Sequence, residues 1–89
     1  MPTKWWAAMR AEIILPELGA APVVLSLWFA DPGDAVYEGD RLVEVRVDGA
    51  TFDVPAPATG RLAEQHALPD DPLAPGQVLG MILVEKKPD

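Results

Sequence analysis

The stretch that decides the fold is Val45–Pro57, which reads VRVDGATFDVPAP. Apolar and polar residues alternate on both sides of a central Asp48-Gly49 pair. Such alternation is typical of half-buried strands, and a two-residue Asp-Gly loop favours a type I′ turn because both of its central residues need a positive φ. The stretch therefore predicts a β-hairpin with an exposed tip at Asp48-Gly49.

Short apolar runs continue outward from this hairpin over the rest of the chain. Ten prolines and seven glycines separate them, at intervals of roughly 8–12 residues that are typical of all-β sandwiches and barrels. No helix of useful length is expected. The predicted strands are Glu12–Leu15, Val23–Ala30, Ala35–Tyr37, Arg41–Val47, Ala50–Pro55, Gly60–His66, Pro72–Leu73 and Val78–Glu85.

The sequence also contains an internal repeat. Ala30–Val47 aligns with Ala67–Val84 at a constant offset of 37 residues, and Pro32/Pro69 and Gly39/Gly76 are among the identical pairs. Two similar β units that each expose one apolar face can close on each other. The repeat predicts a sandwich or flattened β-barrel with pseudo-twofold symmetry, and it places the hairpin tip and the chain ends at opposite ends of the molecule. The expected core positions are Trp28, Leu25, Val36, Leu42, Val45, Leu62, Leu73, Leu79 and Ile82.

Composition excludes several classes of function. The 89 residues carry fourteen acidic and seven basic side chains, a net charge of −7, whereas nucleic-acid binding depends on lysines and arginines. The acidic surface either suits a basic protein partner or only maintains solubility. Without cysteine there is no thiolate nucleophile and no cysteine zinc site. No apolar run reaches signal-peptide or membrane-span length, so we expect a cytoplasmic protein with no membrane contact.

Other candidate site residues carry weaker signals. His66 is the only histidine and has no serine or cysteine partner in a recognisable arrangement, so we expect a structural histidine and not a catalytic base. The aspartates around residues 31–34 and 70–71 lack the spacing of a calcium loop and fit turn-forming acids. We therefore predict neither a catalytic residue nor a metal site. Trp5 and Trp6 either dock a partner, pack back onto the sandwich or belong to an unstructured tail.

Several segments, in order and spacing, resemble the biotinyl/lipoyl attachment domains, and in particular the lipoyl domains of 2-oxo acid dehydrogenase complexes. This resemblance divides the chain into an N-terminal extension (1–11), a lipoyl-like domain (12–85) and a C-terminal tail (86–89). It implies two four-stranded sheets related by a quasi-twofold axis, in accord with the repeat. The segments that carry it are LPELG (Leu15–Gly19), Trp28, PGDAVYEGDRLVEV (Pro32–Val45), DVPAPATGRLAE (Asp53–Glu64) and PGQVLGMILVE (Pro75–Glu85).

The resemblance also implies a function for the hairpin tip. In the family, a lysine at this tip carries lipoate within Asp-Lys-Ala, or biotin within Met-Lys-Met, as an amide. Here the tip reads Asp48-Gly49-Ala50, so lipoyl-type flanks surround a glycine that offers no amine. Glycine also avoids the roughly 1–2 kcal/mol that a side chain pays at positive φ. We expect no lipoyl or biotinyl cofactor, because the remaining lysines lie in the terminal tails, at Lys4, Lys86 and Lys87.

Two functions fit these observations. The first is a non-carrier interaction or structural module that contacts dehydrogenase or acyltransferase subunits and is not an enzyme by itself. The second is a module of a larger enzyme or of an efflux membrane-fusion adaptor, where lipoyl-like folds also occur without the lysine. The first is favoured, because the pattern follows dehydrogenase-complex domains and lacks the coiled-coil heptads of adaptors. An independent enzyme is the least favoured interpretation.

Overall fold

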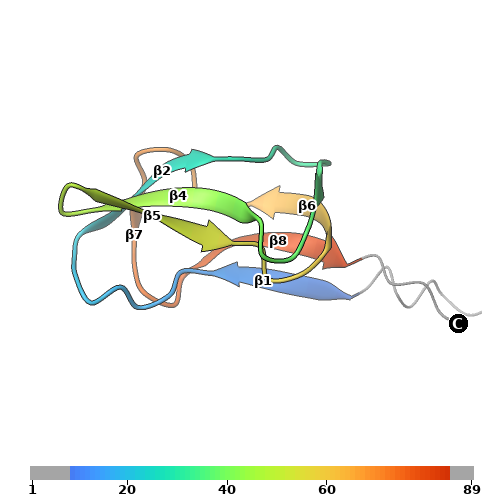
Figure 1. Ribbon diagram of the computed structural model, residues 1–89, viewed down its shortest axis with the longest axis horizontal. Helices are drawn as coiled ribbons and strands as arrows, with labels where there is room; N and C mark the ends of the chain where they lie inside the picture. The colour runs from blue at the N-terminus through green and yellow to red at the C-terminus, as the bar shows by residue number, and fades with distance from the viewer. Residues whose placement is uncertain (1–8, 85–89) are drawn as a thin grey trace, which may run out of the picture.

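The computed structural model describes residues 9–84, which form two four-stranded antiparallel sheets packed face to face (Figure 1). One sheet has the strand order β1-β8-β6-β3 and the other has the order β5-β4-β2-β7. No helix that could cross a membrane occurs within residues 9–84. The strands are β1 (Arg10–Ile14), β2 (Val23–Trp28), β3 (Ala35–Val36), β4 (Arg41–Val47), β5 (Ala50–Pro55), β6 (Gly60–Gln65), β7 (Pro72–Leu73) and β8 (Val78–Val84).

Every predicted strand is present, which confirms the all-β sandwich, and the differences lie at strand ends. β1 begins two residues earlier than expected, because Arg10 and Ala11 pair with β8. β2 ends at Trp28 and not at Ala30, although the Phe29 N–H still donates to the Leu42 carbonyl at 2.9 Å. Glu85, the expected end of the last strand, lies outside the described residues.

The core between the sheets is aliphatic, and each leucine, valine and isoleucine predicted from the repeat is buried in it. The prediction of a core position was wrong for Trp28, which is only half-buried and packs at the margin of this core. Its indole Nε1 donates a hydrogen bond to the Ala67 carbonyl at 2.9 Å. An indole needs such an acceptor for its N–H, and this one holds Trp28 at the margin. The fully buried large side chains are Ile13, Leu15, Leu25, Leu42, Leu62, Leu79, Ile82, Val23, Val43 and Val45.

Backbone hydrogen bonds repeat at the same offset of 37 residues and confirm the pseudo-twofold symmetry. Gly33 donates to the Leu62 carbonyl at 2.7 Å, and its counterpart Asp70 donates to the Leu25 carbonyl at 2.8 Å. The strand pairs are also interrupted at equivalent points, β2–β4 just after Leu25 and β6–β8 just after Leu62. The two halves therefore share details of backbone geometry as well as strand order.

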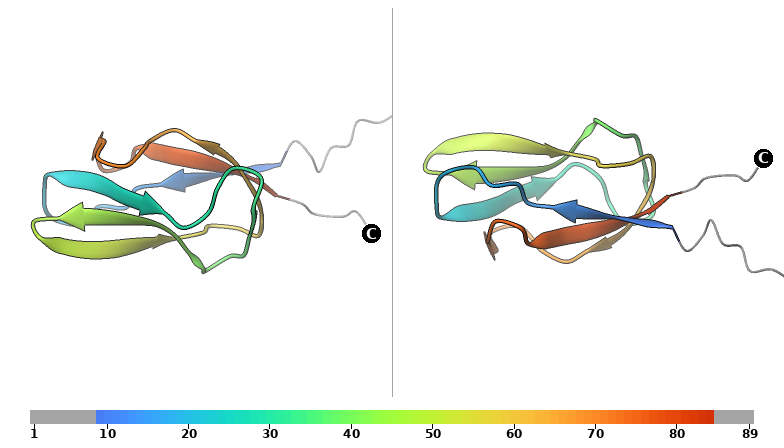
Figure 2. Two further views of the ribbon diagram at one scale, coloured as in Figure 1. Left: turned by 90° about the horizontal axis from the view of Figure 1, so that it is seen from above. Right: turned by 90° about the horizontal axis from the view of Figure 1, so that it is seen from below.

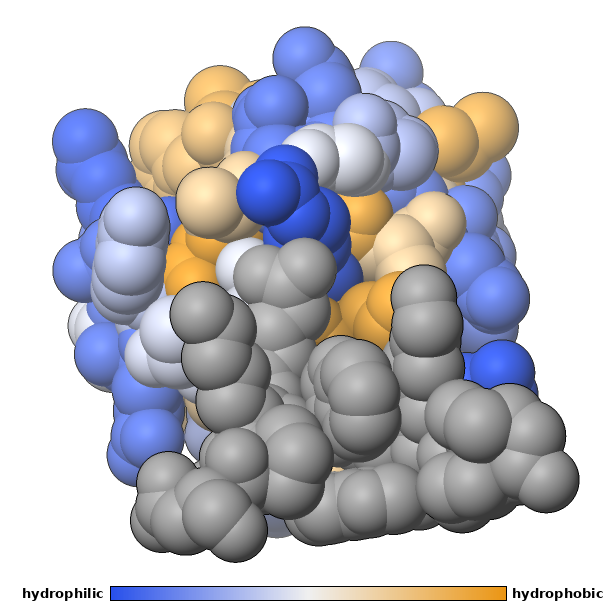
Figure 3. All heavy atoms as spheres, turned by 90° about the vertical axis from the view of Figure 1, so that its right-hand side faces the viewer, coloured by the Kyte–Doolittle hydropathy of each residue, from blue (hydrophilic) through white to orange (hydrophobic). Residues whose placement is uncertain are grey.

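The hairpin tip and the described chain ends lie at opposite ends of the molecule, as predicted. Figure 1 shows the β4–β5 turn at the left, with the start of β1 and the end of β8 at the right, and Figure 2 shows the two sheets as separate layers. At the right-hand end, the Val84 N–H donates to the Met9 carbonyl at 3.0 Å. Figure 3 views this end, where hydrophobic residues show between hydrophilic ones.

Candidate functional site

The predicted hairpin is present, and its turn has the predicted geometry. Val47 pairs with Ala50, which leaves Asp48 and Gly49 as the two turn residues. Their φ angles are 50° and 83°, and a type I′ turn requires positive values at both positions. The tip is exposed and projects from the end of the sandwich (Figure 1).

The space around Gly49 is open. A Cβ atom added to this glycine would have no other atom within 4 Å, apart from those of the glycine itself and its two neighbours. A side chain there would extend into solvent, so its cost would come from the positive φ and not from packing. The site can therefore present a long side chain, but its own residue supplies no functional group.

One ion pair connects the hairpin to the rest of this end of the molecule. Arg46 Nη2 lies 3.6 Å from Asp70 Oδ1, in the loop that precedes β7. The two side chains are 47% and 86% exposed, so solvent screens the pair and it contributes well under about 1 kcal/mol to stability. The pair therefore links the hairpin to the β7 loop only weakly and does not fix the position of the turn.

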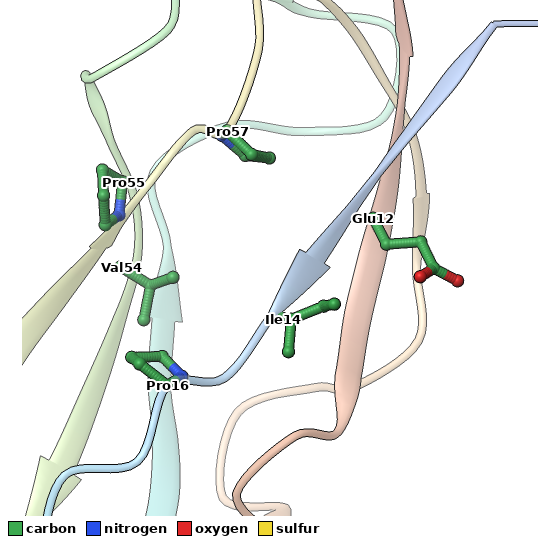
Figure 4. Close-up of a pocket in the computed structure, with 6 residues that line it drawn as sticks. All are labelled: Glu12, Ile14, Pro16, Val54, Pro55 and Pro57. Atoms are coloured by element: carbon green, nitrogen blue, oxygen red, sulfur yellow. The ribbon is translucent and has the colours of Figure 1, made fainter.

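A second feature is a hollow of about 320 Å³ between the edge strands β1 and β5 (Figure 4). Five of its six lining residues are apolar, and Figure 4 shows the carboxylate of Glu12 directed away from the others. The Glu12 carboxylate is the only ionisable group among the side chains that line the hollow. Its lining residues are Glu12, Ile14, Pro16, Val54, Pro55 and Pro57.

The histidine and the aspartates singled out in the sequence are exposed. His66 Nε2 lies 2.5 Å from Glu64 Oε1 on the surface, a contact that the sequence did not predict. Asp34 accepts a hydrogen bond from the Asp31 N–H, and Asp71 accepts one from the Leu68 N–H, so both act as turn-forming acids. Within residues 9–84 no three potential metal ligands come together.

Three lysines and two tryptophans of interest lie outside the described residues. These residues are Lys4, Lys86, Lys87, Trp5 and Trp6. The interpretations attached to them therefore stay predictions.

Comparison with known proteins identifies the fold at the level of the family. Residues 11–82 match the biotin/lipoyl family model, which is described as "Biotin-requiring enzyme". The solution structure of the lipoyl domain of the Azotobacter vinelandii 2-oxoglutarate dehydrogenase complex superimposes with a TM-score of 0.64. That comparison has 26% sequence identity and covers 90% of this chain and 100% of the lipoyl domain.

Two curated relatives are acyltransferase components of such complexes. A Bartonella vinsonii succinyltransferase component of the 2-oxoglutarate dehydrogenase complex is 34% identical over 76 residues, which is 83% of this chain and 18% of the relative. A Pseudomonas aeruginosa lipoamide acyltransferase component of the branched-chain alpha-keto acid dehydrogenase complex is 36% identical over 75 residues, which is 82% of this chain and 18% of the relative. The chain thus spans less than a fifth of either relative. With its two-sheet fold and its match over residues 11–82, the chain belongs to the biotin/lipoyl family and is related to the lipoyl domains of 2-oxo acid dehydrogenase acyltransferases.

Proposed function

We propose that this protein is a lipoyl-domain-like module that carries no lipoyl or biotinyl group and acts through protein contacts, as an interaction or structural part of a 2-oxo acid dehydrogenase assembly. The residue at the hairpin tip carries the proposal. The turn has positive φ angles at both central positions, and the residue between Asp48 and Ala50 is glycine. The tip thus keeps the turn of a carrier hairpin but has no acceptor group.

The chemistry of attachment explains why this residue matters. A lysine Nζ attacks the carbonyl carbon of the activated lipoyl or biotinyl group, an amide C–N bond forms, the activating group leaves, and a proton passes to solvent. Gly49 has no side-chain atom for this step. The chain has no lysine between residues 5 and 85, so no residue near the tip in sequence can replace it.

The geometry of the turn supports a domain that has kept the hairpin shape although it no longer attaches a cofactor. Gly49 sits at φ 83°, where glycine avoids a cost of roughly 1–2 kcal/mol that an L side chain would pay. Selection for turn stability alone would favour glycine there once no cofactor had to be attached. The hairpin tip then serves only as a structural turn, and the module functions through the rest of its surface.

Partners are proposed from the relatives and from charge. The relatives are components of dehydrogenase complexes, so we propose contact with dehydrogenase or acyltransferase subunits in the cytoplasm. The net charge of −7 suits a basic patch on such a subunit and disfavours nucleic acid. The module supplies binding surface to an assembly and performs no reaction by itself.

Intact mass spectrometry tests the proposal. The full chain is expressed with lipoate–protein ligase and biotin ligase, with both cofactors supplied, beside a lipoyl domain that keeps its tip lysine. We expect the control to gain one lipoyl group and this chain to keep the mass of its bare sequence. A mass increase of one lipoyl or biotinyl group on this chain would contradict the proposal, and peptide mapping would then identify the modified lysine.

A further inference from the structure

The outer face of the β5-β4-β2-β7 sheet carries a mixed group of apolar and charged side chains, here called the outer patch: Leu27, Phe29, Arg41 and Glu44. Leu27 is 38% exposed and Phe29 is 37% exposed, while Trp28 between them packs against the core. Leu27 pairs with Glu44 across β2 and β4. The Arg41 guanidinium carbon lies 4.4 Å from the centre of the Phe29 ring.

The pseudo-twofold symmetry provides an internal control for this exposure. At the offset of 37 residues, the counterparts of Leu27 and Phe29 are Glu64 and His66. The side chains of Glu64 and His66 are 57% and 42% exposed and contact each other. The same backbone positions therefore accept polar residues in the other sheet. The fold therefore does not require apolar side chains at positions 27 and 29.

The charges of the outer patch are unpaired within residues 9–84. Neither Arg41 nor Glu44 makes an ion pair with a described residue, although the chain has fourteen acidic side chains. Leu42 and Val43 are both buried, and the strand pairing shifts between Arg41 and Val43. This irregularity places Arg41 on the same outer face as Glu44, even though they are three residues apart. The outer patch thus combines one cation, one anion and two apolar side chains, and a second exposed carboxylate, Asp53, lies across from Glu44 on β5.

We propose that the outer patch is a self-association surface that binds a second copy of this chain. The two copies would be related by a twofold axis that lies in the interface, runs across the strands and passes between Leu27 and Phe29. This axis would place Leu27 of one copy over Phe29 of the other. The same rotation would place Arg41 over Glu44 in both directions. An isologous contact needs a patch that is complementary to itself. This patch meets that requirement because each Leu27 would face a Phe29 and each Arg41 would face a Glu44.

The expected dimer is weak. The patch spans only β2 with the residue after it and β4, and interfaces well below about 1,200 Å² in total are typical of transient association. A second copy supplies both complementary charges from the same surface, so reciprocal pairing uses Arg41 and Glu44 together. This inference does not depend on Gly49 or on the absence of a cofactor.

Sedimentation equilibrium of the full chain, from about 10 μM to about 1 mM, tests the proposal in the range of weak complexes. We expect the average mass to rise from that of one chain toward twice that value. Arg41→Glu and Glu44→Arg should each remain at the mass of one chain, because each variant brings like charges together. An equimolar mixture of the two variants should regain association, because residues 41 and 44 then face opposite charges again.

Non-specific attraction cannot explain recovery in the mixture. Each substitution shifts the net charge of −7 by two, so both variants remain negative and repel each other overall. A Leu27→Glu/Phe29→His variant copies the residues of the other sheet and should also remain at the mass of one chain, with Glu64→Ala/His66→Ala as the matched control that still associates. Circular dichroism checks that each variant is folded. A wild-type mass that stays at one chain up to the highest concentration would overturn the proposal, as would association that Arg41→Glu leaves unchanged.

Discussion

The two halves of the molecule have the same backbone but use different side chains to join across the pseudo-twofold axis. Trp28 Nε1 donates to the Ala67 carbonyl at 2.9 Å, and its counterpart Gln65 donates through Nε2 to the Ala30 carbonyl at 3.0 Å. An indole and an amide thus perform the same task at equivalent positions. The shared backbone dictates which bond is made, and the identity of the donor is free to vary.

The same comparison separates what the fold needs from what it leaves free. Gly39 and Gly76 occupy equivalent turns with φ angles of 91° and 84°, and both halves keep glycine there. At positions 27 and 64, by contrast, one half has leucine and the other has glutamate. The repeated glycines therefore serve the fold, whereas an exposed position that differs between the halves is a better candidate for function.

The largest expected effect concerns the two leucines at equivalent core positions. Leu42 and Leu79 are 1% and 0% exposed. Leu42→Ala and Leu79→Ala should each lower the free energy of unfolding by about 2–5 kcal/mol, through lost burial and the cavity that remains. Urea denaturation measures both. If either variant unfolded at the wild-type midpoint, that leucine would not belong to a shared core and the symmetric account would fail.

A smaller effect is expected from breaking the two cross-axis bonds. Gln65→Met removes the donor but keeps a side chain of similar length, so it should cost about 1 kcal/mol, the usual net value of one hydrogen bond. Trp28→Phe should cost more, because the smaller ring also leaves space beside Gly80, where the indole packs closely. Thermal unfolding of both variants sharpens the comparison. A neutral Gln65→Met alongside a destabilised Trp28→Phe would mean that the two bonds are not equivalent.

How far the sequence predicts the structure depends on whether a pattern in the sequence marks the feature. The hairpin was predictable because the alternation in Val45–Pro57 and the Asp48-Gly49 turn lie within one short stretch. The core was predictable because the repeat marks the same positions twice. The early start of β1 at Arg10 was not, because a polar residue and an alanine carry no strand signal and their pairing with β8 decides the boundary.

The candidate site divides in the same way. The sequence places Gly49 at the tip of a turn, and the structure has that turn. The contacts of Arg46 with Asp70 and of Arg41 with Phe29 join residues from different segments, so no spacing in the sequence reveals them. Trp28 was expected to be buried and is half-buried, because its depth depends on the acceptor that the other half provides.

Modification of Gly49→Lys by lipoate–protein ligase tests the central claim, that this module differs from a carrier at the tip residue. Asp48 and Ala50 supply the flanks, and nothing within 4 Å obstructs a side chain. The substitution should cost roughly 1–2 kcal/mol at positive φ, which a domain with about 5–15 kcal/mol of stability tolerates.

The measurement is intact mass after incubation of the variant with ligase, lipoate and ATP, beside the wild type and a Gly49→Lys chain that also carries Lys86→Ala and Lys87→Ala. The account predicts one lipoyl group on both Gly49→Lys chains, none on the wild type, and little modification by biotin ligase because the methionine flanks are absent. A folded Gly49→Lys chain that stays unmodified would contradict the account, because the module would then have lost more of the carrier site than its lysine.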